Sequence, residues 1–159
     1  MKNLTEKDLE KIYFGWLGKM IGIRYGAPVE MWESEEIIKQ YGGKDGYFAD
    51  YNDFAADDDS NGPIFFFRAL EECKDFSKYG YEDMANCWRN YVPYEHGFYW
   101  WGGYGVSEEH TAYLNLQKGI EPPASGSIAQ NGKVLAEQIS GQIFSDVWGL
   151  VSPYDYREA

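Results

Sequence analysis

The sequence predicts an all-α fold, a compact bundle of several helices, and three observations lead to that class. Apolar residues recur at helical spacing along most of the chain. Gly and Pro residues fall between these periodic segments, and no segment has the pattern of a strand. The chain has 159 residues, 44% of them hydrophobic, which is enough for one domain with a sizeable core. We therefore expect a single domain over residues 1–159.

The first predicted helix begins near Thr5, because Thr5 and Asp8 approximate a capping box. It ends by Ala27, because Pro28 disfavours helical geometry in the residue before it. An apolar stripe and a glycine stripe share this helix: Leu9, Ile12, Trp16, Met20 and Ile23, beside Gly15, Gly18, Gly22 and Gly26. Each Gly costs about 1 kcal/mol relative to Ala inside a helix. The glycine stripe indicates either close helix–helix packing, which the sequence favours, or a ligand close to the backbone.

Five further helices are predicted. The second runs from Ser34 to about Tyr41, and residues 45–59 are predicted to be a loop. Helix resumes at Gly62-Pro63, with Pro at the first helical position. Residues 64–70 leave little polar face, so we expect this helix to be deeply buried. The others are expected at Tyr81 to Tyr91, from Ser107 to Gly119, and from about Lys133 to Trp148.

The composition predicts which classes of partner are excluded and in which cellular compartment the protein lies. The net charge is -12, so we expect no duplex nucleic acid and no anionic membrane as partner. No segment approaches the roughly 18 apolar residues of a membrane span, and the N-terminus lacks the apolar segment of a signal peptide. Cys73 and Cys87 are expected to be buried thiols in a reducing cytoplasm. The cytoplasm is the predicted location.

The run Asp57-Asp58-Asp59-Ser60 is the strongest chemical signal. Three consecutive carboxylates repel one another, and two influences keep them ionised: the positive end of a helix and a bound hard cation. One interpretation is a solvated acidic loop that caps the following helix. The other is a metal site.

A calcium-binding EF-hand is a rival explanation of the same run. Asp57, Asp59 and Asn61 occupy its first, third and fifth positions, with Gly62 at the sixth. The twelfth position requires a bidentate Glu, whereas this sequence has Arg68, which repels a cation. We therefore reject the EF-hand.

Other candidate residues lie outside this run. Glu30 follows the first helix and becomes a site residue only if the fold brings it near Asp58. Gln138, Gln142 and Asp146 share one face of the last predicted helix, as a core network or as a ligand-binding wall. The aromatic loop 98–104, which includes Trp101, is expected either to stack on adenine or to pack in the core.

Three segments together resemble the ADP-ribosylglycohydrolase family. Residues 15–30, GWLGKMIGIRYGAPVE, resemble the opening helix of the family, with its spaced Gly and terminal Pro-x-Glu. Asp57-Asp58-Asp59-Ser60-Asn61 resembles the Asp-Asp-Thr metal motif. Residues 141–153, GQIFSDVWGLVSP, are similar to a segment of bacterial members.

The resemblance implies an all-α, magnesium-dependent hydrolase of ADP-ribosyl bonds with an N- or O-glycosidic link. It implies Asp57, Asp58, Asp59 and Ser60 as ligands of Mg²⁺, with two ions in the family and one at most expected here. It also implies Glu30 and Asp59 as catalytic residues. Gln142, Asp146 and Trp101 are then expected to contact the substrate, an ADP-ribosylated molecule or an ADP-ribose-like small molecule.

The sequence departs from the family in one respect. Members carry a second Asp-x-Asp-Ser/Thr motif that completes the metal site, and no such motif follows Trp148. The chain is then a fragment of a longer protein, one chain of a split site, or a degenerate member, and the first is our expectation. The alternative function is a non-catalytic module that binds ADP-ribose or a divalent cation.

Overall fold

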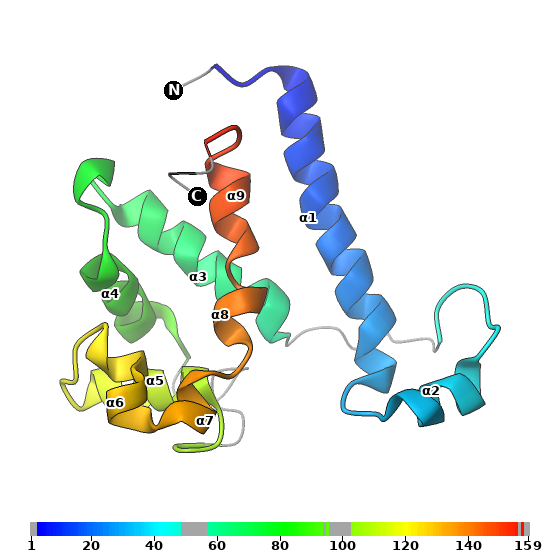
Figure 1. Cartoon of the computed structure of the whole chain (residues 1–159). Coiled ribbons are helices and arrows are strands. Elements are labelled where there is room, and N and C mark those ends of the chain that lie inside the picture. The colour runs from blue at the N-terminus through cyan, green and yellow to red at the C-terminus, as the bar shows by residue number, and fades with distance from the viewer. Residues whose placement is uncertain (1–2, 49–56, 94, 96–102, 156, 158–159) are drawn as a thin grey trace. The chain divides into compact units, whose positions relative to one another are not determined.

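The computed structural model describes residues 3–48, 57–93, 95, 103–155 and 157 (Figure 1). All regular elements within these ranges are helices, so the predicted all-α class is confirmed at that level. None of the described helices is long and apolar enough to cross a membrane. Contacts divide the chain into two compact units, Met1–Ala55 and Ala56–Ala159, which are described separately below. The single domain over 1–159 stays a prediction.

The first unit contains α1 (Glu6–Gly26), a 3₁₀ turn η1 (Ala27–Val29) and α2 (Ser34–Tyr41). The predicted capping box is present: the Thr5 amide donates to the Asp8 carboxylate at 2.9 Å, and the Asp8 amide donates to the Thr5 hydroxyl oxygen at 3.3 Å. This exchange satisfies two amides that have no partner inside the helix. The helix ends where Pro28 predicted, and α2 has the predicted bounds, although its N-cap is Glu33.

An aromatic cluster joins α1 to the segment that follows α2. The ring of Phe48 lies 4.5 Å from that of Tyr25 and 4.8 Å from that of Tyr41, measured between centroids. The Lys44 ammonium donates to the Phe48 carbonyl at 2.7 Å. These contacts hold the turn after α2 against the last turn of α1.

The second unit begins with α3 (Asp58–Glu72), which starts one turn earlier than predicted. The expectation of a start at Gly62-Pro63 is wrong because Asp57 caps the helix: its carboxylate accepts the Ser60 amide at 3.1 Å. Pro63 therefore lies inside the helix, and it has no N–H to donate to the carbonyl of Asp59 four residues earlier. The cap makes the acidic run part of the helix rather than a loop before it.

One face of α3 is buried, not the whole helix. Phe66 and Ala69 are buried, whereas Ile64 is 51% exposed, because it points away from the packed face. The buried face contacts α4 (Tyr81–Tyr91), which has the predicted bounds and follows the short turn η2 (Phe76–Lys78). The Cys87 thiol of α4 donates to the Phe65 carbonyl at 3.0 Å. Both cysteines are free thiols; Cys87 is buried as expected, whereas Cys73 is only half-buried, so the expectation of burial is wrong for it.

Helix α5 (Glu108–Gln117) packs against η4 (Ala124–Gly126) through a buried amide network. The side-chain amide of Asn115 donates to the Ser125 carbonyl and to the Asn131 side-chain oxygen, each at 2.8 Å. The Asn131 amide also donates to the Ser125 carbonyl at 2.8 Å. Asn131 ends the one-turn helix α6 (Ile128–Asn131), so the network fixes this whole connection on α5.

The last predicted helix is broken into three pieces, so the expectation of one helix from Lys133 to Trp148 is wrong. The pieces are α7 (Lys133–Ala136), α8 (Ser140–Ile143) and α9 (Asp146–Val151). Between them, side chains bond to α5 and its preceding turn: the Gln138 amide donates to the Val106 carbonyl at 2.9 Å, and the Ser140 hydroxyl to Glu109 at 3.0 Å. Such bonds compete with the continuous helical ladder.

The core of the second unit lies between α3 and the segment from Phe144 to Trp148. The ring of Phe66 stacks on that of Trp148 with centroids 5.6 Å apart, and meets that of Phe144 edge-on at 6.0 Å. Val147 is completely buried between them. This packing fixes the first turns of α3, where the acidic run lies.

Candidate metal centre

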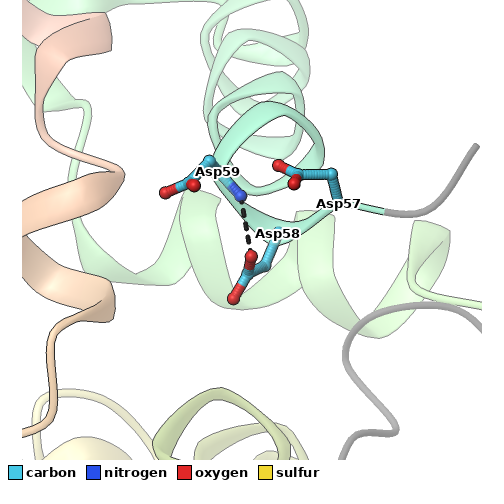
Figure 2. A group of neighbouring side chains, drawn as sticks. All are labelled: Asp57, Asp58 and Asp59. Carbon is cyan, nitrogen blue, oxygen red and sulfur yellow. Dashed lines mark hydrogen bonds between the residues drawn. The ribbon is translucent and has the colours of Figure 1, made fainter. Parts of the chain in front are cut away.

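The carboxylates of Asp57, Asp58 and Asp59 surround the first turn of α3 (Figure 2). One oxygen from each carboxylate lies within 4.8 Å of the other two. All three side chains are half-buried. A search of the described residues for three or more acidic, His or Cys side chains close enough to hold a metal ion finds this group.

The cap of α3 brings these carboxylates close together. Asp57 has extended backbone geometry, φ -135° and ψ 129°, so its side chain folds back over the first turn. Its carbonyl oxygen accepts the Asn61 main-chain amide at 3.0 Å, the Asn61 side-chain amide at 2.7 Å and the Ser60 hydroxyl at 3.3 Å. Three donors therefore bond to the carbonyl oxygen of Asp57. The oxygens that remain to bind a cation are those of the carboxylates.

Each carboxylate has a distinct place in the turn. One oxygen of Asp57 accepts the Ser60 amide, and one oxygen of Asp58 accepts the Asp59 amide at 3.0 Å. Figure 2 shows the Asp58 carboxylate below the turn and that of Asp59 to one side of it. A carboxylate has two oxygens, so each of these side chains retains a second oxygen for a cation.

The charges of the cluster oppose its own assembly. Two carboxylates at this separation repel by about 1 kcal/mol in water and by about 4 kcal/mol at an effective dielectric of 20. The amides at the start of α3 reduce that cost, because the N-terminal end of a helix carries a partial positive charge. A divalent cation would reduce it further.

The donor set fits a hard divalent cation. Carboxylate oxygens are the protein ligands that Mg²⁺ and Ca²⁺ prefer. Opposite ligands of Ca²⁺ lie about 4.6–5.2 Å apart, and those of Mg²⁺ about 4.0–4.2 Å. The three oxygens lie no farther apart than opposite ligands of the larger ion do.

The remaining predicted residues lie in several parts of the chain. The hydroxyl of Ser60 donates to the Asp57 carbonyl and accepts the Asn61 side-chain amide at 3.4 Å. Glu30 is exposed and directly follows η1 in the unit Met1–Ala55. Asp58 belongs to the other unit, so a position of Glu30 near Asp58 stays a prediction. Trp101 lies outside the described residues.

Gln142 and Asp146 are exposed and lie in different helices, α8 and α9. The predicted common face of Gln138, Gln142 and Asp146 is wrong, because the helix that would align them is interrupted twice. Gln138 instead caps α5: its side-chain oxygen accepts the Glu108 amide at 3.0 Å. The predicted contact of Gln142 and Asp146 with a substrate stays a prediction.

Sequence reasoning missed Asn61 as a residue that shapes the site. It lies four residues after Asp57, so its side chain reaches back to the carbonyl of the cap at 2.7 Å. Once Asp57 is recognised as the N-cap, the spacing itself indicates this contact.

Comparisons of the chain with protein-family profiles, curated proteins and solved structures found no match. The resemblance to ADP-ribosylglycohydrolases therefore stays a prediction that rests on the three sequence segments. The observations that bear on function are the geometry and chemistry of the site itself.

Proposed function

We propose that these 159 residues are part of a magnesium-dependent hydrolase of the ADP-ribosylglycohydrolase type. Such an enzyme would cleave N- or O-glycosidic bonds to ADP-ribose. One observation carries the proposal: three carboxylates at the capped start of a helix each have an oxygen within 4.8 Å of the other two. The sequence resemblance supplies the substrate class. Mg²⁺ is the proposed cofactor.

The proposal gives each residue a role. Asp57, Asp58, Asp59 and Ser60 would hold Mg²⁺ through oxygen atoms. Bound Mg²⁺ would supply Lewis-acid chemistry and orient a substrate diol. Asp59 and Glu30 would accept protons as catalytic residues, and Gln142, Asp146 and Trp101 would contact the substrate.

The sequence also favours an alternative, a non-catalytic module that binds ADP-ribose or a divalent cation. All three candidate carboxylates come from one helical turn, and these 159 residues contain no second Asp-x-Asp-Ser/Thr motif after Trp148. One turn offers a cation few ligands, which favours weak binding. For these 159 residues we accordingly expect weak cation binding and no turnover.

We place the protein in the cytoplasm as part of the same proposal. Cys73 and Cys87 are both free thiols. Free thiols are stable in a reducing compartment, where disulfides are rare.

Unfolding experiments with Mg²⁺ and ADP-ribose test the site. A ligand at ten times its Kd stabilises the folded state by about 1.4 kcal/mol. For the complete protein, we expect MgCl₂ to raise the unfolding midpoint above that in NaCl of equal ionic strength, and ADP-ribose to raise it further. The gain should disappear in Asp58→Asn and Asp59→Asn. Asp155→Asn, which changes an exposed acid outside the cluster, is the control.

Two results would count against parts of this proposal. If MgCl₂ raised the unfolding midpoint equally in Asp58→Asn, Asp59→Asn and the control variant, the assignment of the metal site would be wrong. Turnover of an ADP-ribosylated substrate by the 159 residues would instead contradict the need for a second motif.

A further inference from the structure

One face of α1 is apolar and exposed. Leu17 lies at its centre, with Tyr13 about one turn before it and Ile21 about one turn after it, and these three side chains are 37–62% exposed. Among the described residues of Met1–Ala55, no apolar side chain is buried. An apolar helix face stabilises a protein mainly through packing. This face is therefore a packing surface that the described residues of the first unit do not bury.

Opposite charges lie at the two ends of this face. Glu10 lies three residues before Tyr13 and is exposed, and Arg24 lies three residues after Ile21. At 100° per residue, these four residues and Leu17 fall within a sector of about 80°. We call the five residues the Leu17 face. Their spacing is three, four, four and three residues, so it is the same in both chain directions.

The Leu17 face is complementary to itself when a second copy runs in the opposite direction. In an antiparallel pair of α1 helices centred on Leu17, Glu10 of each copy lies opposite Arg24 of the other. Tyr13 likewise lies opposite Ile21. A parallel pair would place Glu10 beside Glu10 and Arg24 beside Arg24, so like charges would repel. A two-fold axis joins the same patch of both copies, and the Leu17 face meets that requirement.

The surroundings of Arg24 are compatible with such a pair. Its guanidinium lies over the Tyr47 ring, 5.5 Å from the centroid. A guanidinium has five N–H donors around its edge. A contact between its flat face and a ring therefore does not prevent an ion pair with Glu10 of a second copy.

The exposed area of this part of α1 is at the lower limit for a specific dimer. Leu9, Phe14 and Tyr25 flank the Leu17 face and are 41–61% exposed. An aromatic side chain buries about 150–250 Å² when fully covered, so the apolar residues here offer roughly 500 Å² per copy. A pair would then bury about 1,000 Å², the least expected of a biological interface. The net charge of -12 on each copy opposes association, which also favours weak pairing.

We propose that two copies of the chain pair through α1, in opposite directions, with Leu17 of both copies at the two-fold axis. The apolar residues of the Leu17 face supply most of the affinity. The ion pairs between Glu10 and Arg24 contribute little energy but determine the direction of pairing. A second copy fits this face better than a membrane does, because anionic lipids attract clustered cations and the face has one acid and one base.

Sedimentation equilibrium of the full 159-residue chain tests the pairing. In 0.15 M NaCl, where the Debye length is about 8 Å, we expect a dimer with a Kd on the order of 10 µM. Leu17→Glu places two carboxylates at the axis and should raise the Kd at least about tenfold. Ile38→Glu, at a 69% exposed position of α2, is the matched control and should keep the wild-type Kd.

Exchanging the charges tests the direction of pairing. Glu10→Arg places two positive charges opposite each other, Arg24→Glu places two negative charges opposite each other, and each should raise the Kd by about tenfold. Mixing equal amounts of the two variants should restore the wild-type Kd, because each supplies the charge that the other lacks. Without that recovery, the antiparallel alignment is wrong.

Cysteine cross-linking locates the two-fold axis. In a background of Cys73→Ser and Cys87→Ser, Leu17→Cys should form a disulfide between copies when it is oxidised by copper phenanthroline. Tyr13→Cys should not, because antiparallel pairing about Leu17 separates the two copies of residue 13 by about 12 Å along the helices. Equal cross-linking at both positions would overturn the proposal. A wild-type chain that stays monomeric well above the expected Kd would also overturn it.

Discussion

Phe144 lies so close to Gly62 that a β-carbon at position 62 would be 2.6 Å from its ring. Real β-carbons do not approach other atoms so closely. The ring is 4% exposed and is confined by Phe66 and Val147, so it cannot swing aside freely. Gly62 therefore has a packing role, which allows the core to reach the first turns of α3.

Gly62→Ala should destabilise the second unit. Overpacking of a filled core costs about 1–3 kcal/mol, whereas replacing Gly with Ala inside a helix gains at most about 1 kcal/mol. We expect the clash to prevail and the urea midpoint to fall. Gly149→Ala in α9 is the matched control, since a β-carbon there meets nothing within 4 Å.

A double-mutant cycle separates the clash from other effects. Adding Phe144→Leu to Gly62→Ala makes room for the β-carbon, so the double variant should lose less stability than the two single losses together. Strict additivity would show that the ring is not what excludes a side chain at position 62.

Asp57 offers a way to separate capping from cation binding. Asn caps a helix about as well as Asp, whereas Ala costs about 1 kcal/mol. Without divalent cation, Asp57→Asn should therefore match the wild type in urea unfolding, and Asp57→Ala should fall below it. With MgCl₂, both variants should gain less stability than the wild type.

The Asp57→Asn result distinguishes the two interpretations of the acidic run. A full magnesium response in that variant would assign Asp57 to the cap alone. A lost response with unchanged stability in the absence of Mg²⁺ would place its charge in the cation site.

Much of the fold follows from local signals. The Thr5–Asp8 box and Pro28 determine the limits of α1. The bounds of α2 and α4 also match, because Gly and Pro punctuate them in the sequence. Such features act within a few residues, so the sequence displays them directly.

The mistakes arose where distant residues decide the local structure. Nothing within residues 133–148 shows that Gln138 and Ser140 bond to residues 106–109, and these bonds accompany the breaks between α7 and α8. The start of α3 differs from the prediction for another reason: Pro63 is typical of a first helical position, but the cap at Asp57 starts the helix one turn earlier. The three Asp residues of the candidate site were predictable as a run, while their close spacing in the structure depends on the backbone angles of the cap.

The Asn115 network should contribute strongly to stability. Asn115 is completely buried, and its amide bonds join α5 to η4 and α6. Asn115→Ala leaves the Ser125 and Asn131 acceptors with fewer donors, at about 1–3 kcal/mol for each buried group left unsatisfied. Chemical denaturation should show this loss, whereas Asn90→Ala, at an exposed position of α4, should change stability by less than about 0.5 kcal/mol.

Cys87 should react slowly with thiol reagents in the folded protein. Burial, together with the charge of Glu72, raises its pKa to about 11. At pH 8 this leaves about one thiolate in a thousand, against about one in four for an ordinary thiol. Alkylation of the Cys73→Ser variant should therefore be at least about 200-fold slower in the folded state than in urea.

The same pKa makes stability depend on alkaline pH. The folded pKa of Cys87 lies above the unfolded value of about 8.5, so the unfolded chain loses its proton first. The free energy of unfolding should then fall as pH rises from about 8.5 to 11. Cys87→Ser keeps a donor for the Phe65 carbonyl without this titration, so its decline over that range should be shallower. Equal slopes in the two proteins would place the titrating group elsewhere.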